Sequence, residues 1–223
     1  MPAPTARPDP DLPVTPARRR FTHPELVDLR TAWLAEERLA TADPEGHHWC
    51  PGQHGWLLRA GLDEVVERVV EPDTWGSASF YRFTTLDAPV AVGLLERLSA
   101  EYLETERQND GPSIGAVLRA VVAHPDRLRA HGYVVGPGRC DERITVEGVL
   151  VRTDHEIVVG EHHGPGCQCD ELERYVAALG VDDARVAPHE VTRWWPGAVA
   201  WHVPGQEPGA VRDDGPWYRL WWD

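Results

Sequence analysis

Apolar residues recur at helical spacing through the first half of the chain. Leu29, Trp33 and Leu34, for example, share one face of a helix. Thr22 and Glu25 precede this face with the spacing of a capping box. The same pattern predicts helices over residues 22–40, 56–70 with an interruption at Gly61, 89–107 after Asp87, 113–122 starting at Ser113, and a short one from Pro125 to Gly132.

The second half is rich in apolar and aromatic runs of strand length, and residues 77–84 already show one. One amphipathic helix, residues 172–179, interrupts these runs. A turn at Thr153 and Asp154 predicts a hairpin. The predicted strands are residues 77–84, 143–151, 156–160, 189–195, 198–203 and 217–222. This order predicts an α+β fold, with a helical N-terminal half and an antiparallel sheet with one packed helix in the C-terminal half.

The chain divides by composition into three regions. Residues 1–20 form a proline-rich arm with few large apolar side chains, which cannot bury enough surface to order itself. Residues 21–132 are mainly helical, and residues 133–223 are rich in strands with one helix. The glycine-rich stretch 132–139 is a candidate boundary, but a single domain over 21–223 fits the pattern equally well.

The charge balance excludes several classes of function. The 36 acidic residues outnumber the 22 basic ones, so the formal net charge is -14, and every basic residue is arginine. Without lysine the chain has no Schiff-base lysine, no pyridoxal phosphate anchor and no P-loop. Binding to nucleic acid or to an anionic membrane is not expected, because both require clustered positive charge.

The N-terminal segment does not predict export. The arginines of 18–20 are followed by acidic and basic residues where an export signal needs an apolar stretch. No apolar run is long enough to span a bilayer. With only four cysteines in 223 residues, these features predict a cytoplasmic protein in a reducing compartment.

Two segments rich in histidine and cysteine are the strongest candidates for chemistry. They lie in loops broken by proline and glycine, where short segments can wrap around an ion. Thiolate and imidazole ligands favour zinc in tetrahedral sites. The candidate ligands are His47, His48 and Cys50 in the first segment and His162, His163, Cys167 and Cys169 in the second.

The same cysteines allow two other interpretations. The segments contain a CxC but no pair of CxxC motifs, so the spacing is also compatible with no bound metal. A Cys167–Cys169 disulfide would close a small strained ring and would be redox-labile. Cys140, between acidic and basic neighbours, is predicted to be an ordinary thiol.

Tryptophans are concentrated in the last thirty residues. Strand alternation puts Trp217, Arg219 and Trp221 on one face of their strand, opposite a face that packs in the core. An arginine between two indoles offers stacking and cation–π contacts to a ligand or partner. The alternative is that these indoles are core residues and the stem of Arg219 lies along them.

These observations indicate a class of protein but identify no reaction and do not decide whether it is an enzyme. The leading hypothesis is a cytoplasmic α+β protein that binds a transition metal, zinc, in a structural or hydrolytic role. The alternative is a non-catalytic interaction module with an acidic, tryptophan-rich sheet surface. A metal-free enzyme with a pocket lined by tryptophan and arginine is a third option. The expected partner is a protein or a small molecule.

Overall fold

The computed structural model describes residues 29–42, 54–72, 79–160, 164–194 and 215–223. The helices are α1 (Leu29–Ala42), α2 (Trp56–Arg59), α3 (Leu62–Val66), α4 (Ala88–Arg97), α5 (Ala100–Thr105), α6 (Ile114–Ala123) and α7 (Cys169–Ala178). The strands are β1 (Val70–Pro72), β2 (Phe80–Leu86), β3 (Leu128–Val135), β4 (Arg143–Arg152), β5 (Glu190–Trp194) and β6 (Trp217–Trp221).

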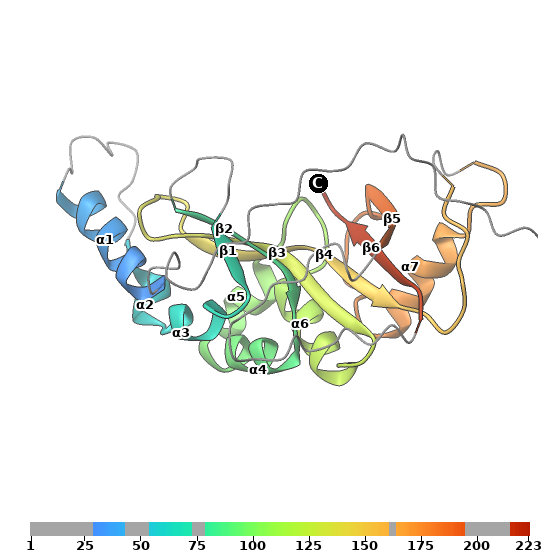
Figure 1. Ribbon diagram of the computed structural model, residues 1–223, viewed down its shortest axis with the longest axis horizontal. Coiled ribbons are helices and arrows are strands. Elements are labelled where there is room, and N and C mark those ends of the chain that lie inside the picture. The colour runs from blue at the N-terminus through green and yellow to red at the C-terminus, as the bar shows by residue number, and fades with distance from the viewer. Residues whose placement is uncertain (1–28, 43–53, 73–78, 161–163, 195–214) are drawn as a thin grey trace, which may run out of the picture.

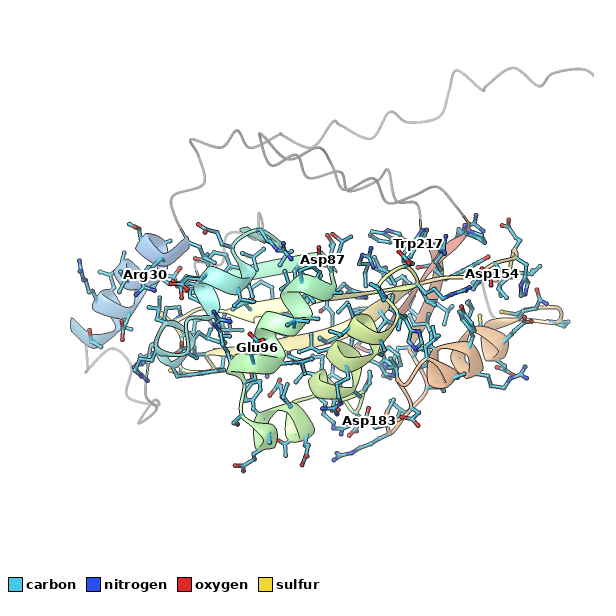
Figure 2. All side chains as sticks on the ribbon, turned by 90° about the horizontal axis from the view of Figure 1, so that it is seen from below. Arg30, Asp87, Glu96, Asp154, Asp183 and Trp217 are labelled. Carbon is cyan, nitrogen blue, oxygen red and sulfur yellow. The ribbon has the colours of Figure 1, made fainter. Side chains whose placement is uncertain are left out.

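The strands form one antiparallel sheet in the order β1-β2-β3-β4-β6-β5. Helices α4, α5 and α6 cover one face of it, α1 to α3 lie at the β1 end, and α7 lies at the β5 end (Figure 1). Seen from below, the helices stand in front of the sheet, with Arg30 and Trp217 toward opposite ends (Figure 2). The α+β prediction is confirmed.

The core lies between the sheet and the helices. Its largest fully buried side chains include Trp33 of α1, Phe83 of β2, Leu118 of α6 and Tyr218 of β6. Elements far apart in sequence therefore share one apolar core, which extends from α1 to α7.

Side-chain caps explain where three helices begin. Asp87 accepts a hydrogen bond from the Val90 amide, and Ser113 accepts one from the Ala116 amide, as predicted for the starts of α4 and α6. The single helix predicted over 89–107 is wrong. Leu98 has an extended backbone, and Ser99 caps a new helix, α5, by accepting from the Tyr102 amide.

Two predicted elements are replaced by others. The short helix predicted from Pro125 is wrong, because residues 128–135 form β3 at the centre of the sheet. The candidate boundary at 132–139 overlaps the end of β3, and the division into domains stays a prediction. The strand at 156–160 does not form either. Ile157 instead bonds to the Tyr218 hydroxyl through both its amide, at 2.6 Å, and its carbonyl, at 3.0 Å.

Within the described ranges, every helix is too short or too polar to cross a membrane. The predicted strand at 198–203 and the arm at 1–20 lie outside the described residues.

Candidate functional site

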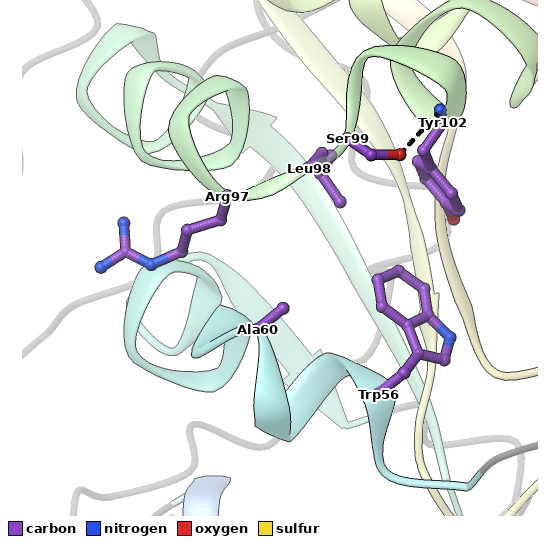
Figure 3. Close-up of a pocket in the computed structure, with 6 residues that line it drawn as sticks. All are labelled: Trp56, Ala60, Arg97, Leu98, Ser99 and Tyr102. Carbon is purple, nitrogen blue, oxygen red and sulfur yellow. Dashed lines mark hydrogen bonds between the residues drawn. The ribbon is translucent and has the colours of Figure 1, made fainter.

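A cavity of about 410 Å³ opens between α2 and the junction of α4 with α5. Trp56 of α2 and Ala60, directly after α2, line one side, and Arg97, Leu98, Ser99 and Tyr102 line the other side from the junction (Figure 3). The break between α4 and α5 shapes this cavity, since it turns the chain and brings residues 97–102 to face α2. Most of the lining is apolar, as in sites that bind small organic molecules.

Trp56 and Tyr102 form an aromatic wall whose polar atoms are already occupied. Their ring centroids lie 5.2 Å apart at an angle of 54°. The Trp56 indole N–H donates to the Glu142 carbonyl at 2.9 Å, and the Tyr102 hydroxyl donates to the Ile144 carbonyl at 2.8 Å. Burial first, and then the charge of Glu106, raises the pKa of Tyr102, so its hydroxyl stays protonated at neutral pH. The wall therefore offers stacking surface without a proton acceptor.

Glu142, just before β4, holds the segment that carries Trp56. Its carboxylate accepts hydrogen bonds from the Gly55 amide at 2.6 Å and from the Leu57 amide at 2.8 Å. Burial raises the pKa of Glu142, and the hydrogen bonds from Leu57 and Gly55 oppose that rise. The first turn of α2 is thus capped by a side chain from a distant part of the sequence.

Arg97 supplies the positive charge at the edge of the cavity. Its stem lines the cavity, and its guanidinium points away from the aromatic wall (Figure 3). The guanidinium donates to the Gly93 carbonyl at 3.3 Å, and no described carboxylate forms an ion pair with it. The Ser99 hydroxyl is held by its cap on Tyr102. None of the six lining residues is His, Cys, Asp or Glu.

Trp217, Arg219 and Trp221 lie on the sheet face that points away from α4, α5 and α6. Their partners across β4 are Arg152, Leu150 and Gly148, whereas Tyr218, Leu220 and Trp222 lie in the core. Trp217 is buried, with 4% of its surface exposed, and Arg219 and Trp221 are partly exposed. The two indoles therefore do not form one exposed patch, and partner binding here stays a prediction.

The face around these residues is rich in arginine, unlike the acidic surface expected from the net charge. Arginines stack on aromatic rings here. The guanidinium carbon of Arg219 lies 5.7 Å from the centre of the Trp221 ring, and that of Arg129 lies 6.0 Å from the centre of the Trp217 ring. Strands β2 to β6 place on this face Arg82, Arg129, Arg143, Arg152 and Arg219 with Glu147 and Glu190.

A buried histidine lies at the centre of this face. His131 Nδ1 is 3.5 Å from a Glu147 carboxylate oxygen, which Arg82 also contacts at 2.9 Å. Burial lowers the pKa of His131, although Glu147 opposes the shift. Burial tends to raise the pKa of Glu147, but His131, Arg82 and Trp221 together lower it. His131 is thus neutral in the folded protein around neutral pH and Glu147 is ionised.

His131→Gln should flatten the pH dependence of stability just below pH 6.5. The folded pKa of His131 lies below its usual 6.5, so the unfolded chain takes up this proton first, and the wild type loses stability as the pH falls through that value. One proton contributes at most about 1.4 kcal/mol per pH unit. Urea denaturation between pH 5 and 7 measures the slope of the free energy of unfolding against pH. The exposed His155→Gln is the control, and an equal slope in wild type and His131→Gln would contradict the assignment.

The two described members of the candidate zinc set are a close pair of thiols. Cys167 Sγ and Cys169 Sγ lie 2.9 Å apart without a disulfide bond between them. Burial first, and then Cys167, raises the pKa of Cys169 to about 12, which disfavours the thiolate that zinc requires. No group of three or more candidate metal ligands occurs in the described part of the chain. His47, His48, Cys50, His162 and His163 lie outside it, so zinc binding stays a prediction.

Cys140 is disulfide-bonded, so the prediction of an ordinary thiol is wrong. A disulfide is unusual in a reducing compartment, and the cytoplasmic location stays a prediction.

No family model, curated protein or solved structure matches the chain. The cavity was missed from sequence because its two walls are separated by some forty residues and meet only through the fold. The one local signal was Ser99, three residues before Tyr102, which is a helix N-cap spacing inside an apparently continuous helix.

Proposed function

We propose that the protein binds a small, largely apolar organic molecule with one anionic group in the cavity between α2 and the α4–α5 junction. The observation that carries this proposal is the aromatic wall of Trp56 and Tyr102, whose polar atoms are satisfied by backbone groups. A wall of this kind gains from covering its apolar surface and loses no hydrogen bond when a ligand binds.

The size and charge of the cavity define the class of ligand. A volume of about 410 Å³ is at the small end of the range for organic ligands and suits a compound of about two or three rings. The Arg97 guanidinium, on a flexible stem at the edge, is the group that would contact a carboxylate or sulfonate. The ring system would lie along Leu98 and the aromatic wall.

Anilinonaphthalene sulfonate tests the proposal, because it combines two fused rings, an aniline ring and one sulfonate. We expect saturable one-to-one binding to the folded full-length chain, measured by the increase in probe fluorescence. Ala60→Leu fills the cavity and should weaken binding by at least about tenfold. Arg97→Ala should weaken it about threefold or more, and more strongly at low salt.

Matched controls lie on α5 and α6 and do not line the cavity. Ala100→Leu adds the same bulk at an exposed position of α5, and Arg119→Ala removes an exposed arginine of α6. Both should bind the probe within about twofold of wild type. Circular dichroism checks that every variant is folded. Unchanged probe affinity in a folded Ala60→Leu variant would refute the proposal.

A further inference from the structure

The loop before α7 brings two thiols into contact. Cys169 is the first residue of α7, and Cys167 lies two residues earlier in a turn closed by a hydrogen bond from its amide to the Gly164 carbonyl at 3.0 Å. Gln168 ties the loop to Val158 by two hydrogen bonds, since its amide donates to the Val158 carbonyl at 2.7 Å and its side-chain oxygen accepts from the Val158 amide at 2.8 Å. The turn therefore holds the two sulfur atoms together.

The distance between the sulfur atoms distinguishes zinc binding from disulfide formation. Two thiolates on one tetrahedral zinc ion lie roughly 3.8 Å apart, because each Zn–S bond is about 2.3 Å long. The sulfur atoms of a disulfide are about 2.0 Å apart. At 2.9 Å, Cys167 Sγ and Cys169 Sγ would have to move apart to bind zinc together and approach by less than 1 Å to form a bond.

We propose that Cys167 and Cys169 form a redox-active pair that exchanges with low-molecular-weight disulfides and cycles between dithiol and disulfide. This site is separate from the cavity and does not depend on the function proposed there.

Burial assigns the two cysteines different roles. Cys169 is 6% exposed and packs against the core, whereas Cys167 is partly exposed. Gly164 and Gly166, which flank the approach to Cys167, have open space around the position of a β carbon. The Gly160 amide donates to Cys167 Sγ at 3.4 Å and would stabilise negative charge on it. Cys167 is thus the attacking thiol and Cys169 the resolving one.

The exchange balances in two steps. The Cys167 thiol gives up its proton and attacks one sulfur of a disulfide R–S–S–R, which forms a mixed disulfide and releases R–S⁻, protonated to R–SH. The Cys169 thiol then loses its proton and attacks Cys167 Sγ, which releases the second R–SH. The two cysteines are oxidised to a disulfide, and one R–S–S–R is reduced to two R–SH.

Trypsin digestion places Cys167 and Cys169 together on one peptide. The chain has no lysine, and cleavage after Arg152 and Arg174 yields a peptide of residues 153–174 that contains Cys167 and Cys169, while Cys140 falls in another peptide. The full-length protein is equilibrated with glutathione and glutathione disulfide at a series of ratios, alkylated and digested. In oxidising mixtures we expect this peptide to escape alkylation and to be about 2 Da lighter, the loss of two hydrogens, reversibly on reduction.

Two variants test the roles. Cys169→Ser removes the resolving thiol, so a glutathione adduct should accumulate on Cys167, where wild type shows none at steady state. Cys167→Ser leaves only the buried thiol and should acquire little adduct. The proposal is overturned if wild-type peptide 153–174 stays fully alkylated in the most oxidising mixture, or if it accumulates a stable glutathione adduct. Equal adduct formation in the two variants would overturn the assignment of roles.

Discussion

Gly148→Ala is expected to lower the free energy of unfolding by more than about 3 kcal/mol, or to prevent folding. Gly148 lies on β4 opposite His131 of β3 and Trp221 of β6. A β carbon at this position would lie 2.1 Å from His131 Nε2 and 2.3 Å from the Leu220 carbonyl oxygen. The imidazole could rotate away, but the carbonyl belongs to the backbone of the paired strand, so the central strands would have to separate.

Urea denaturation followed by circular dichroism measures this effect. Gly164→Ala is the matched control, since a β carbon there meets nothing within 4 Å, and it should change stability by less than about 0.5 kcal/mol. The double variant Gly148→Ala with His131→Ala removes only the side-chain clash and should recover little stability. Full recovery would show that the histidine, not the strand backbone, sets the requirement for glycine.

Glu142→Ala is expected to lower the free energy of unfolding by about 2–4 kcal/mol, because it leaves the buried amides of Gly55 and Leu57 without an acceptor. The substitution should also loosen the wall of the cavity, since these two amides flank Trp56. We therefore expect weaker binding of anilinonaphthalene sulfonate at temperatures where the variant is still folded. Thermal unfolding and probe titration measure the two effects on the same sample.

The neighbouring Asp141→Ala is the control for this substitution. Asp141 is exposed and pairs with Arg139, two residues away, at 2.9 Å, so its removal should lower the free energy of unfolding by less than about 0.5 kcal/mol and leave probe binding unchanged. Equal costs for the two variants would contradict the role of Glu142 as the cap of α2.

Elements with a local signal were predictable, and those set by the fold were not. Gly61 between α2 and α3 and the Ser113 cap of α6 are visible in the sequence and were predicted. β3 was missed because the proline at 125 indicated the start of a helix, although apolar Leu128 and Ala130 alternate with polar Arg129 and His131 in the sequence. The strand at 156–160 failed because Tyr218 takes the backbone groups of Ile157.

The same distinction applies to the candidate sites. Alternation placed Trp217, Arg219 and Trp221 on one face correctly, because it depends only on neighbours in one strand. It could not show that Trp217 is buried or that arginines from three other strands share this face, since both depend on strand pairing. The closeness of Cys167 and Cys169 follows from a local turn, whereas the cavity requires α2 and α5 to meet.

The Tyr102 hydroxyl covers backbone groups at an edge of β4, where another copy of the chain could pair at high protein concentration. β6 pairs with residues 148–152 of β4, so the first half of β4 has no described strand on that side. The Tyr102 hydroxyl binds both the Ile144 carbonyl and the Ile144 amide, at 2.8 and 3.1 Å, which are groups that another chain could use to add a strand. A side chain of the cavity wall thus also protects an edge of the sheet from intermolecular pairing and aggregation.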